Sequence, residues 1–173
     1  MANTFLAAQG VDVKLSRVEA DKLPLARTLL ENALQRGVEI LLPTDVVVGG
    51  SLHAENGQVV PAGAIPDGTM ALDIGPESVR RFAAKIAAAK TVFWNGPMGL
   101  FERPAFASGS INLAKAMSAA DGFTVVGGGD SAAAVSVAGA GVAAGFKHIS
   151  TGCGASLELI EGKKLPGIEA LRP

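Results

Sequence analysis

The sequence predicts an α/β fold in which helices cover both faces of a parallel sheet. Three observations support this prediction. Short β-prone apolar runs alternate with longer segments of helical periodicity, several of the junctions between them are rich in glycine, and 49% of the 173 residues are hydrophobic. Strands that alternate with helices are typical of parallel sheets, and a chain of this length and composition can bury a core of its own.

The first elements are two helices and a strand. Residues 2–10 predict a short helix that ends at Gly10, and residues 19–37 predict a longer one with Gly37 at its C-terminus. Residues 38–43, VEILLP, form a continuous apolar run and predict a buried parallel strand. The apolar residues that recur near helical spacing in the longer helix are Leu25, Leu29, Leu30, Ala33 and Leu34.

The next segment is different in character. Between residues 46 and 74 the runs are short and separated by glycine and proline, which predicts a small antiparallel or irregular insertion. Regular alternation then returns, because β-prone runs and helical segments follow each other to the end of the chain. We expect helices at 76–90, 110–120, after the glycines at 127–129, and at 155–162, and strands at 91–94, 123–126 and 147–151.

A glycine-rich turn joins the strand at 123–126 to the following helix, in the stretch TVVGGGDSAAAV. Such a turn delivers the helix N-terminus, with its unpaired N–H groups, to the carboxyl edge of the sheet, where it can bind an anion such as phosphate. Asp130 beside the phosphates could hold Mg²⁺ through oxygen. The alternative is a tight turn in which Asp130 only caps the helix, since the turn lacks both the spaced dinucleotide pattern and the phosphate-loop lysine.

Two further loops belong to the same edge of the predicted sheet. The stretch ISTGCGASLELIEG repeats the order of strand end, glycine-rich turn and helix start, with Gly152 in the turn. Two helix N-termini at one edge suit phosphoryl transfer, which depends on fixed N–H dipoles, a metal ion and positioning. The loop WNGPMGLFE adds Asn95, Pro97 and Glu102, whose carboxylate could bind a sugar hydroxyl or be only a solvated surface acid.

The composition argues against several other classes of protein. With 15 Lys and Arg against 16 Asp and Glu, and no basic stripe, the chain gives no sign of nucleic-acid binding, so we expect a small-molecule partner. A single cysteine, no signal peptide and no 18-residue apolar run predict a cytoplasmic protein without a membrane segment. Cys153 is not expected to be a catalytic nucleophile with His148 as its base, because no acid is placed to orient the histidine. His53 and the pair Lys163 and Lys164 are expected to be solvated.

Four segments carry a resemblance to a known family. DIGPES, VFWNGPMGLFE, VVGGGDS and HISTGCGASLELIEGKKLPGIEAL, in this order and spacing, resemble the C-terminal nucleotide-binding domain of phosphoglycerate kinases. LLPTD and MANTFL also fit, so the resemblance covers essentially all of residues 1–173. It implies a doubly wound, Rossmann-like sheet in three α/β/α layers. It also implies reversible phosphoryl transfer between ATP and 3-phosphoglycerate, giving ADP and 1,3-bisphosphoglycerate, with Mg²⁺, in glycolysis.

The resemblance also implies roles for individual residues. Three positions depart from the family: Ser131 replaces a usual threonine and keeps its hydroxyl, Cys153 replaces the middle glycine of a triplet, and Ala71 stands where glycine is frequent. The implied roles are Met70, Ala71 and Leu72 beside the adenine, Asn95 and Pro97 along the ribose and phosphates, Glu102 on the ribose hydroxyls, Gly128, Gly129 and Ser131 on the phosphates, Asp130 on Mg²⁺, and Gly129 and Gly152 as the catalytic pair at the transferred group.

By the same resemblance, the chain is an incomplete copy of the family's domain. In the family, two further strands precede the residue that matches Met1, lie between the strands expected at 38–42 and 91–94, and contribute phosphate-binding lysines. The N-terminal domain that binds 3-phosphoglycerate would belong to the missing N-terminal part of the polypeptide. We therefore expect the isolated chain to be inactive in phosphoryl transfer.

The sequence leaves two alternatives to a kinase fragment. One is an inactive fragment that binds a nucleotide or a partner protein. The other is a dinucleotide-dependent oxidoreductase, which is disfavoured because the glycine spacing is wrong and no acid follows about 20 residues after the glycines.

Overall fold

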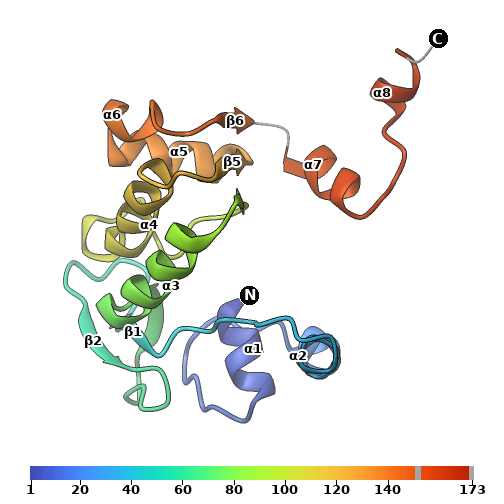
Figure 1. Ribbon diagram of the computed structural model, residues 1–173. Coiled ribbons are helices and arrows are strands. Elements are labelled where there is room, and N and C mark those ends of the chain that lie inside the picture. Colours follow the sequence, from blue (N-terminus) through green and yellow to red (C-terminus); the bar gives the residue numbers. More distant parts are fainter. Residues whose placement is uncertain (151–152, 172–173) are drawn as a thin grey trace. The chain divides into compact units, whose positions relative to one another are not determined.

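The computed structural model describes residues 1–150 and 153–171. The chain divides into two compact units (Figure 1). The N-terminal unit comprises residues 1–84 and 98–113, and the C-terminal unit comprises residues 85–97 and 114–173. Each unit contains its own three-stranded sheet.

The N-terminal unit begins with the two helices that the sequence predicts. Helix α1 spans Ala2–Ala8, and helix α2 spans Leu23–Gln35 after a 3₁₀ turn, η1, at Ala20–Lys22. Glycine follows each α-helix with a positive φ, 90° at Gly10 and 66° at Gly37. Because only glycine adopts this conformation without strain, both helix ends fall where the glycines predicted them.

The expected strand at residues 38–43 is not formed, so that prediction is wrong. A strand needs a hydrogen-bonded neighbouring strand, and none of the described strands pairs with this segment. Val38 at its start is 58% exposed. Helix α2 forms as predicted, but its apolar side is largely uncovered by the described residues, with Ala26 its only buried residue. The most exposed leucines of α2 are Leu25, Leu29 and Leu34.

The predicted insertion is a small antiparallel sheet, which confirms that expectation. Strands β1 (Asp45–Gly49), β2 (Gln58–Pro61) and β3 (Met70–Ile74) lie in the order β2-β1-β3. Val46 in the central strand pairs with Val60 on one side and Ile74 on the other. The buried cluster beneath this sheet consists of Leu6, Val13, Val46, Val48, Val60, Ala62 and Ile65.

Helix α3 (Pro76–Ala88) begins on a cap supplied by strand β1. The Asp45 carboxylate accepts the N–H groups of Glu77 at 2.9 Å and Ser78 at 2.7 Å. These are two of the N–H groups that a helix start leaves without a carbonyl partner. Gly75 is required here because a Cβ would overlap the Asp45 carboxylate. The segments PTD and GPES therefore form one capping structure although Asp45 and Ser78 are 33 positions apart in the sequence.

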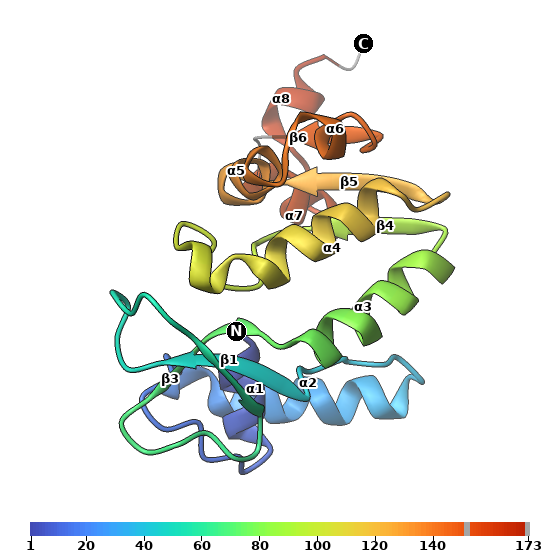
Figure 2. The same ribbon diagram turned by 90° about the vertical axis from the view of Figure 1, so that its left-hand side faces the viewer.

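The C-terminal unit contains the parallel sheet that the sequence predicts. Strands β4 (Thr91–Trp94), β5 (Phe123–Gly127) and β6 (His148–Ser150) lie in the order β4-β5-β6. Trp94 pairs with Val126, and both pairings are parallel. Figure 2 shows β4 and β5 side by side with the same direction. The α/β class and its parallel sheet are thus confirmed.

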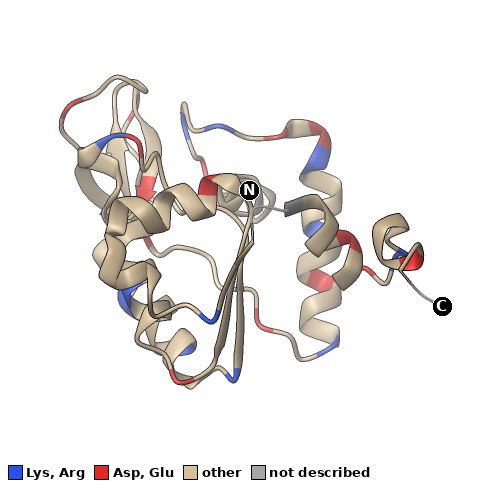
Figure 3. Cartoon of the chain, turned by 90° about the horizontal axis from the view of Figure 1, so that it is seen from above, with Lys and Arg blue, Asp and Glu red and all other residues tan. Residues whose placement is uncertain are grey.

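The remaining helices connect or follow these strands. A 3₁₀ turn, η2 (Pro104–Phe106), precedes α4 (Ser108–Ser118), and the Ala-rich segment forms α5 (Gly129–Ala138) and α6 (Ala140–Ala143), separated at Gly139. The chain ends with α7 (Cys153–Ile160) and α8 (Pro166–Glu169). Among the described residues no helix is long and apolar enough to cross a membrane. Positions of acidic and basic residues are scattered along the ribbon (Figure 3).

Candidate functional site

The three glycines at the junction of β5 and α5 lie in three different settings. Gly127 ends β5 with no room for a side chain, because a Cβ would lie 2.5 Å from the Phe93 ring. Gly128 has φ 101° and ψ 152°, a backbone conformation that is essentially restricted to glycine. Gly129 opens the helix, and a Cβ there would meet nothing within 4 Å. A side chain therefore cannot be accommodated without strain at Gly127 or Gly128, whereas the space around Gly129 is free.

The start of α5 has the properties of an anion site. The N–H of Gly128 bonds to the Ser150 carbonyl at 2.9 Å, and the N–H of Ala132 bonds to the Gly128 carbonyl. The intervening N–H groups are those that a helix start leaves without carbonyl partners, and the helix dipole adds partial positive charge. Because Gly129 leaves the approach open, a phosphate can reach them.

Asp130 lies in the first turn of α5 and is exposed. Its carboxylate accepts no hydrogen bond from any residue that the structure describes, so the alternative of a helix-capping Asp130 finds no support. No group of three or more His, Cys, Asp or Glu that could hold a metal occurs in the described residues. A single carboxylate fits Mg²⁺ that arrives on nucleotide phosphates, since this ion is commonly held by one or two carboxylates together with phosphate oxygens.

The loop after β4 is held against the start of α5. The Gly96 N–H donates to the Ser131 hydroxyl at 2.7 Å, and Ser131 is only 1% exposed. Asn95 and Pro97, on either side of Gly96, are half-buried. The structure thus brings the predicted residues Asn95 and Pro97 together with the glycine turn. It gives Ser131 a role that the sequence did not predict, because its oxygen joins two loops.

Trp94 is the last residue of β4 and the only tryptophan of the chain. It is 5% exposed, and its indole N–H has no hydrogen-bond partner among the described residues. A buried indole N–H usually finds a hydrogen-bond partner, so Trp94 is unusual in being buried without one among the described residues. It also places an intrinsic fluorophore one residue before Asn95.

The predicted adenine and ribose residues lie in the N-terminal unit. Met70 and Ala71 are half-buried and Leu72 is buried, all on strand β3. Ala71 packs against the cluster beneath the antiparallel sheet. Since successive strand residues point to opposite faces, Met70 and Leu72 share the other face, and Ala71 can offer a ligand only its backbone. Glu102 is exposed in the turn before η2.

Two buried polar residues of this unit were not predicted from the sequence. Asp73, 4% exposed, accepts the Gly109 N–H at 2.7 Å and the Ile74 N–H at 2.8 Å. Burial raises the pKa of Asp73 to about 6, against the effect of those two hydrogen bonds. Ser110, which is fully buried, accepts the Met98 N–H at 2.9 Å. The sequence carried one signal for Asp73, an acidic residue within the apolar run ALDI. An acid that is buried in a strand needs hydrogen-bond donors, so this position indicates N–H groups close to it.

The structure gives the remaining candidate residues less support as members of a binding site. Gly152 lies outside the described residues. His53 is exposed, as expected, and its Nδ1 lies 3.0 Å from Arg103. Lys163 is exposed and pairs with Glu161 at 2.6 Å, which agrees with the prediction of a solvated lysine.

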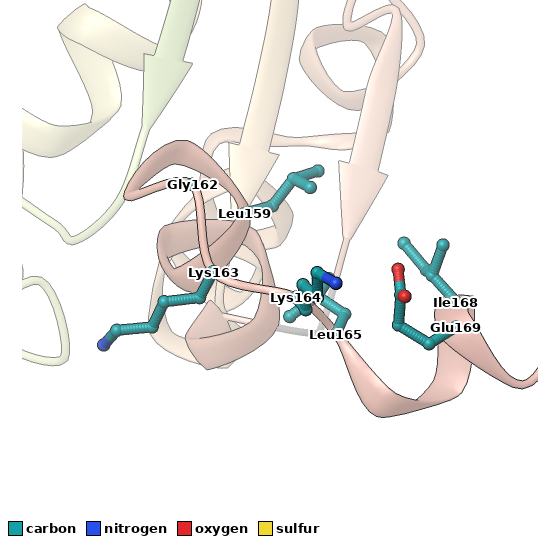
Figure 4. Close-up of a pocket in the computed structure, with 7 residues that line it drawn as sticks. All are labelled: Leu159, Gly162, Lys163, Lys164, Leu165, Ile168 and Glu169. Atoms are coloured by element: carbon teal, nitrogen blue, oxygen red, sulfur yellow. The ribbon is translucent and has the colours of Figure 1, made fainter.

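A hollow of about 210 Å³ lies between α7 and α8 and includes none of the predicted nucleotide-binding residues. Figure 4 shows Lys163 extending away from Ile168 and Glu169. The residues that line the hollow are Leu159, Gly162, Lys163, Lys164, Leu165, Ile168 and Glu169.

Comparison with known proteins assigns the family. A family model described as phosphoglycerate kinase matches residues 1–163. The chain belongs to the phosphoglycerate kinase family. Curated phosphoglycerate kinases of Moorella thermoacetica and of Anaeromyxobacter sp. strain K are 56% and 57% identical over 99% and 98% of this chain.

Solved structures of the family agree with this assignment. Phosphoglycerate kinase from Coxiella burnetii superposes on 97% of this chain with a TM-score of 0.90 and 36% identity, and that from Pyrococcus horikoshii OT3 on 98% with a TM-score of 0.84 and 30% identity. The chain spans 43% of the length of these two curated relatives, and 43% and 42% of the solved chains.

Proposed function

We propose that residues 1–173 are the C-terminal nucleotide-binding domain of a phosphoglycerate kinase and bind ADP and ATP. The observation that carries the proposal is the open glycine turn at the start of α5, with the β4 loop fixed beside it by the Gly96–Ser131 hydrogen bond. In this proposal the phosphates bind the N–H groups at Gly129 and Asp130, with Asn95 and Pro97 alongside. The complete enzyme would transfer a phosphoryl group reversibly between ATP and 3-phosphoglycerate.

The metal and the sugar have separate proposed partners. Asp130 binds Mg²⁺ on the phosphates, which neutralises charge that would otherwise oppose transfer of the phosphoryl group. Glu102 accepts hydrogen bonds from the ribose hydroxyls, and Met70 and Leu72 contact the adenine. Gly129 is proposed to lie at the transferred group, where backbone N–H groups stabilise its negative charge, and the family resemblance implies the same role for Gly152.

The 173 residues by themselves are proposed to be inactive in phosphoryl transfer. The reaction depends on holding two substrates in line, an advantage worth about 7–11 kcal/mol when the geometry is right. The proposed site for 3-phosphoglycerate belongs to the part of the family's chain that lies outside these residues. Nucleotide binding is the activity that the glycine turn can support alone.

The experiment is a titration of the purified chain with Mg·ADP, followed by Trp94 fluorescence and calorimetry, and a coupled kinase assay on the same sample. We expect saturable Mg·ADP binding without turnover, and turnover after addition of the N-terminal part of a related kinase. Turnover by the chain alone at the rate of an intact kinase would refute the proposed dependence on the second part. Absence of nucleotide binding would refute the proposed site.

A further inference from the structure

The loop that carries Glu102 is attached to strand β3 at its centre. The Leu100 N–H donates to the Leu72 carbonyl at 2.8 Å, and the Arg103 N–H donates to the Leu100 carbonyl at 3.0 Å. Gly99 approaches so closely that a Cβ would overlap Asp73 and lie 2.6 Å from the Leu72 carbonyl. The proposed adenine strand and the proposed ribose loop therefore meet at one place, beside Asp73.

Helix α4 holds the beginning of the same loop. The Ser110 hydroxyl accepts the Met98 N–H at 2.9 Å and the Gly99 N–H at 3.4 Å. Ser110 is the third residue of α4, so the position of the helix start determines whether the loop finds its acceptor. The start of α4 is in turn bound to Asp73, through the Gly109 N–H at 2.7 Å.

Asp73 is thus the group that connects strand, loop and helix. Its two oxygens have separate partners, because Oδ1 accepts the Ile74 N–H and Oδ2 accepts the Gly109 N–H. No ion pair among the described residues includes Asp73, although a carboxylate that is 4% exposed loses most of its hydration. Hydrogen bonds to an ionised carboxylate are about twice as strong as neutral ones, so the charge strengthens this connection.

We propose that Asp73 is a positioning residue for the nucleotide: by binding the start of α4 it holds the Met98–Glu102 loop on β3, and so sets the position of Glu102 relative to Met70 and Leu72. The inference rests on the proposed nucleotide site. Burial raises the pKa of Asp73 to about 6, so its charge at neutral pH comes at a cost to the free energy of folding.

The test compares Asp73→Asn with the native chain at pH 8. Asparagine has nearly the same shape but only one acceptor oxygen, so one of the two N–H groups loses its partner. We expect amide hydrogen exchange at Gly109, Met98 and Gly99 to become at least tenfold faster relative to the amides of β1, and Mg·ADP affinity to fall about tenfold. Asp67→Asn is the matched control, because its carboxylate is 92% exposed and the same atoms change.

A second variant separates the two connections. Ser110→Ala removes the acceptor of Met98 and Gly99 but leaves the Asp73–Gly109 hydrogen bond. It should accelerate exchange in the loop and lower Mg·ADP affinity while Gly109 remains protected. Unchanged exchange at Met98 and Gly99 in Asp73→Asn would overturn the proposal, and so would a loosened loop with undiminished affinity. Failure of the native chain to bind Mg·ADP would instead refute the nucleotide site, while the exchange rates still decide whether Asp73 holds the loop.

Discussion

Replacement of Ser131 by alanine tests the link between the β4 loop and the glycine turn. The change removes the acceptor of the Gly96 N–H, a hydrogen bond of 2.7 Å at a residue that is 1% exposed. Leaving a buried donor without a partner costs about 1–3 kcal/mol. Gly96 itself is half-buried, so water can replace part of the interaction, and we expect the lower part of this range, about 1–2 kcal/mol in the free energy of unfolding.

Denaturant unfolding followed by Trp94 fluorescence measures this loss. Trp94 is the only tryptophan, lies two residues before Gly96, and is 5% exposed in the folded chain, so its emission reports unfolding of the C-terminal unit. The loop would also be released from the start of α5, and we expect Mg·ADP affinity to fall about tenfold, since 1.4 kcal/mol corresponds to a factor of ten.

Ser136→Ala is the control for this experiment. Ser136 lies on the same helix, is exposed, and donates only to the Ala132 carbonyl one turn earlier. Its replacement should change the free energy of unfolding by less than about 0.5 kcal/mol and leave the affinity unchanged. If Ser131→Ala is as mild as Ser136→Ala in both measurements, the proposed bridge between the two loops is refuted.

Three further predictions concern the same sites. Burial raises the pKa of Asp73 to about 6 in the folded chain from 3.8, so the folded state binds this proton more tightly than the unfolded state does. The free energy of unfolding of the native chain, measured against that of Asp73→Asn, should therefore fall by about 3 kcal/mol as pH rises from about 4 to about 6. A difference that does not change with pH would contradict the burial argument. Gly128→Ala should lower the free energy of unfolding by about 1–3 kcal/mol, because φ is 101° at this residue. Gly129→Ala should leave stability intact but lower Mg·ADP affinity, because its Cβ enters open space at the proposed phosphates. If the two variants have equal effects in denaturation and in titration, the distinction between a structural Gly128 and a ligand-facing Gly129 is refuted. Asp130→Asn should abolish the Mg²⁺-dependent part of ADP affinity without changing unfolding, and identical Mg²⁺ dependence in calorimetry would remove Asp130 as the metal ligand.

Local sequence signals predicted the elements that local physics determines. Gly10, Gly37 and Gly162 each follow a helix with positive φ, as expected for residues that end helices. The strands at Thr91–Trp94 and Phe123–Gly127 were predicted because continuous apolar runs of this length are typical of parallel strands. The short glycine- and proline-separated runs correctly predicted the antiparallel insertion.

The prediction at residues 38–43 was wrong because a strand is defined by its neighbours as well as by its own residues. VEILLP has the composition of a buried strand, but no described strand pairs with it. Propensity alone does not determine pairing, since β-propensity largely reflects packing against adjacent strands.

The polar connections of the candidate site could not be predicted, because they join residues that are distant in the sequence. Ser131 and Gly96 are 35 residues apart, and Asp73 and Gly109 are 36 apart. The sequence identified Ser131 through its place in the glycine turn, but not that its oxygen would hold a second loop. Asp73 stands as an acid in the apolar run ALDI, but the sequence does not identify Gly109 as its donor.

The central claim is that the glycine turn of this chain binds a nucleotide. An amide-resolved NMR titration of the 173-residue chain with Mg·ADP tests it most directly, because each loop reports separately. We predict saturable shifts concentrated at Asn95–Pro97 and Gly128–Ser131, with smaller ones at Met70–Leu72 and Glu102. Shifts confined to the hollow between α7 and α8, or the absence of any saturable shift at Gly128–Ser131, would contradict the account.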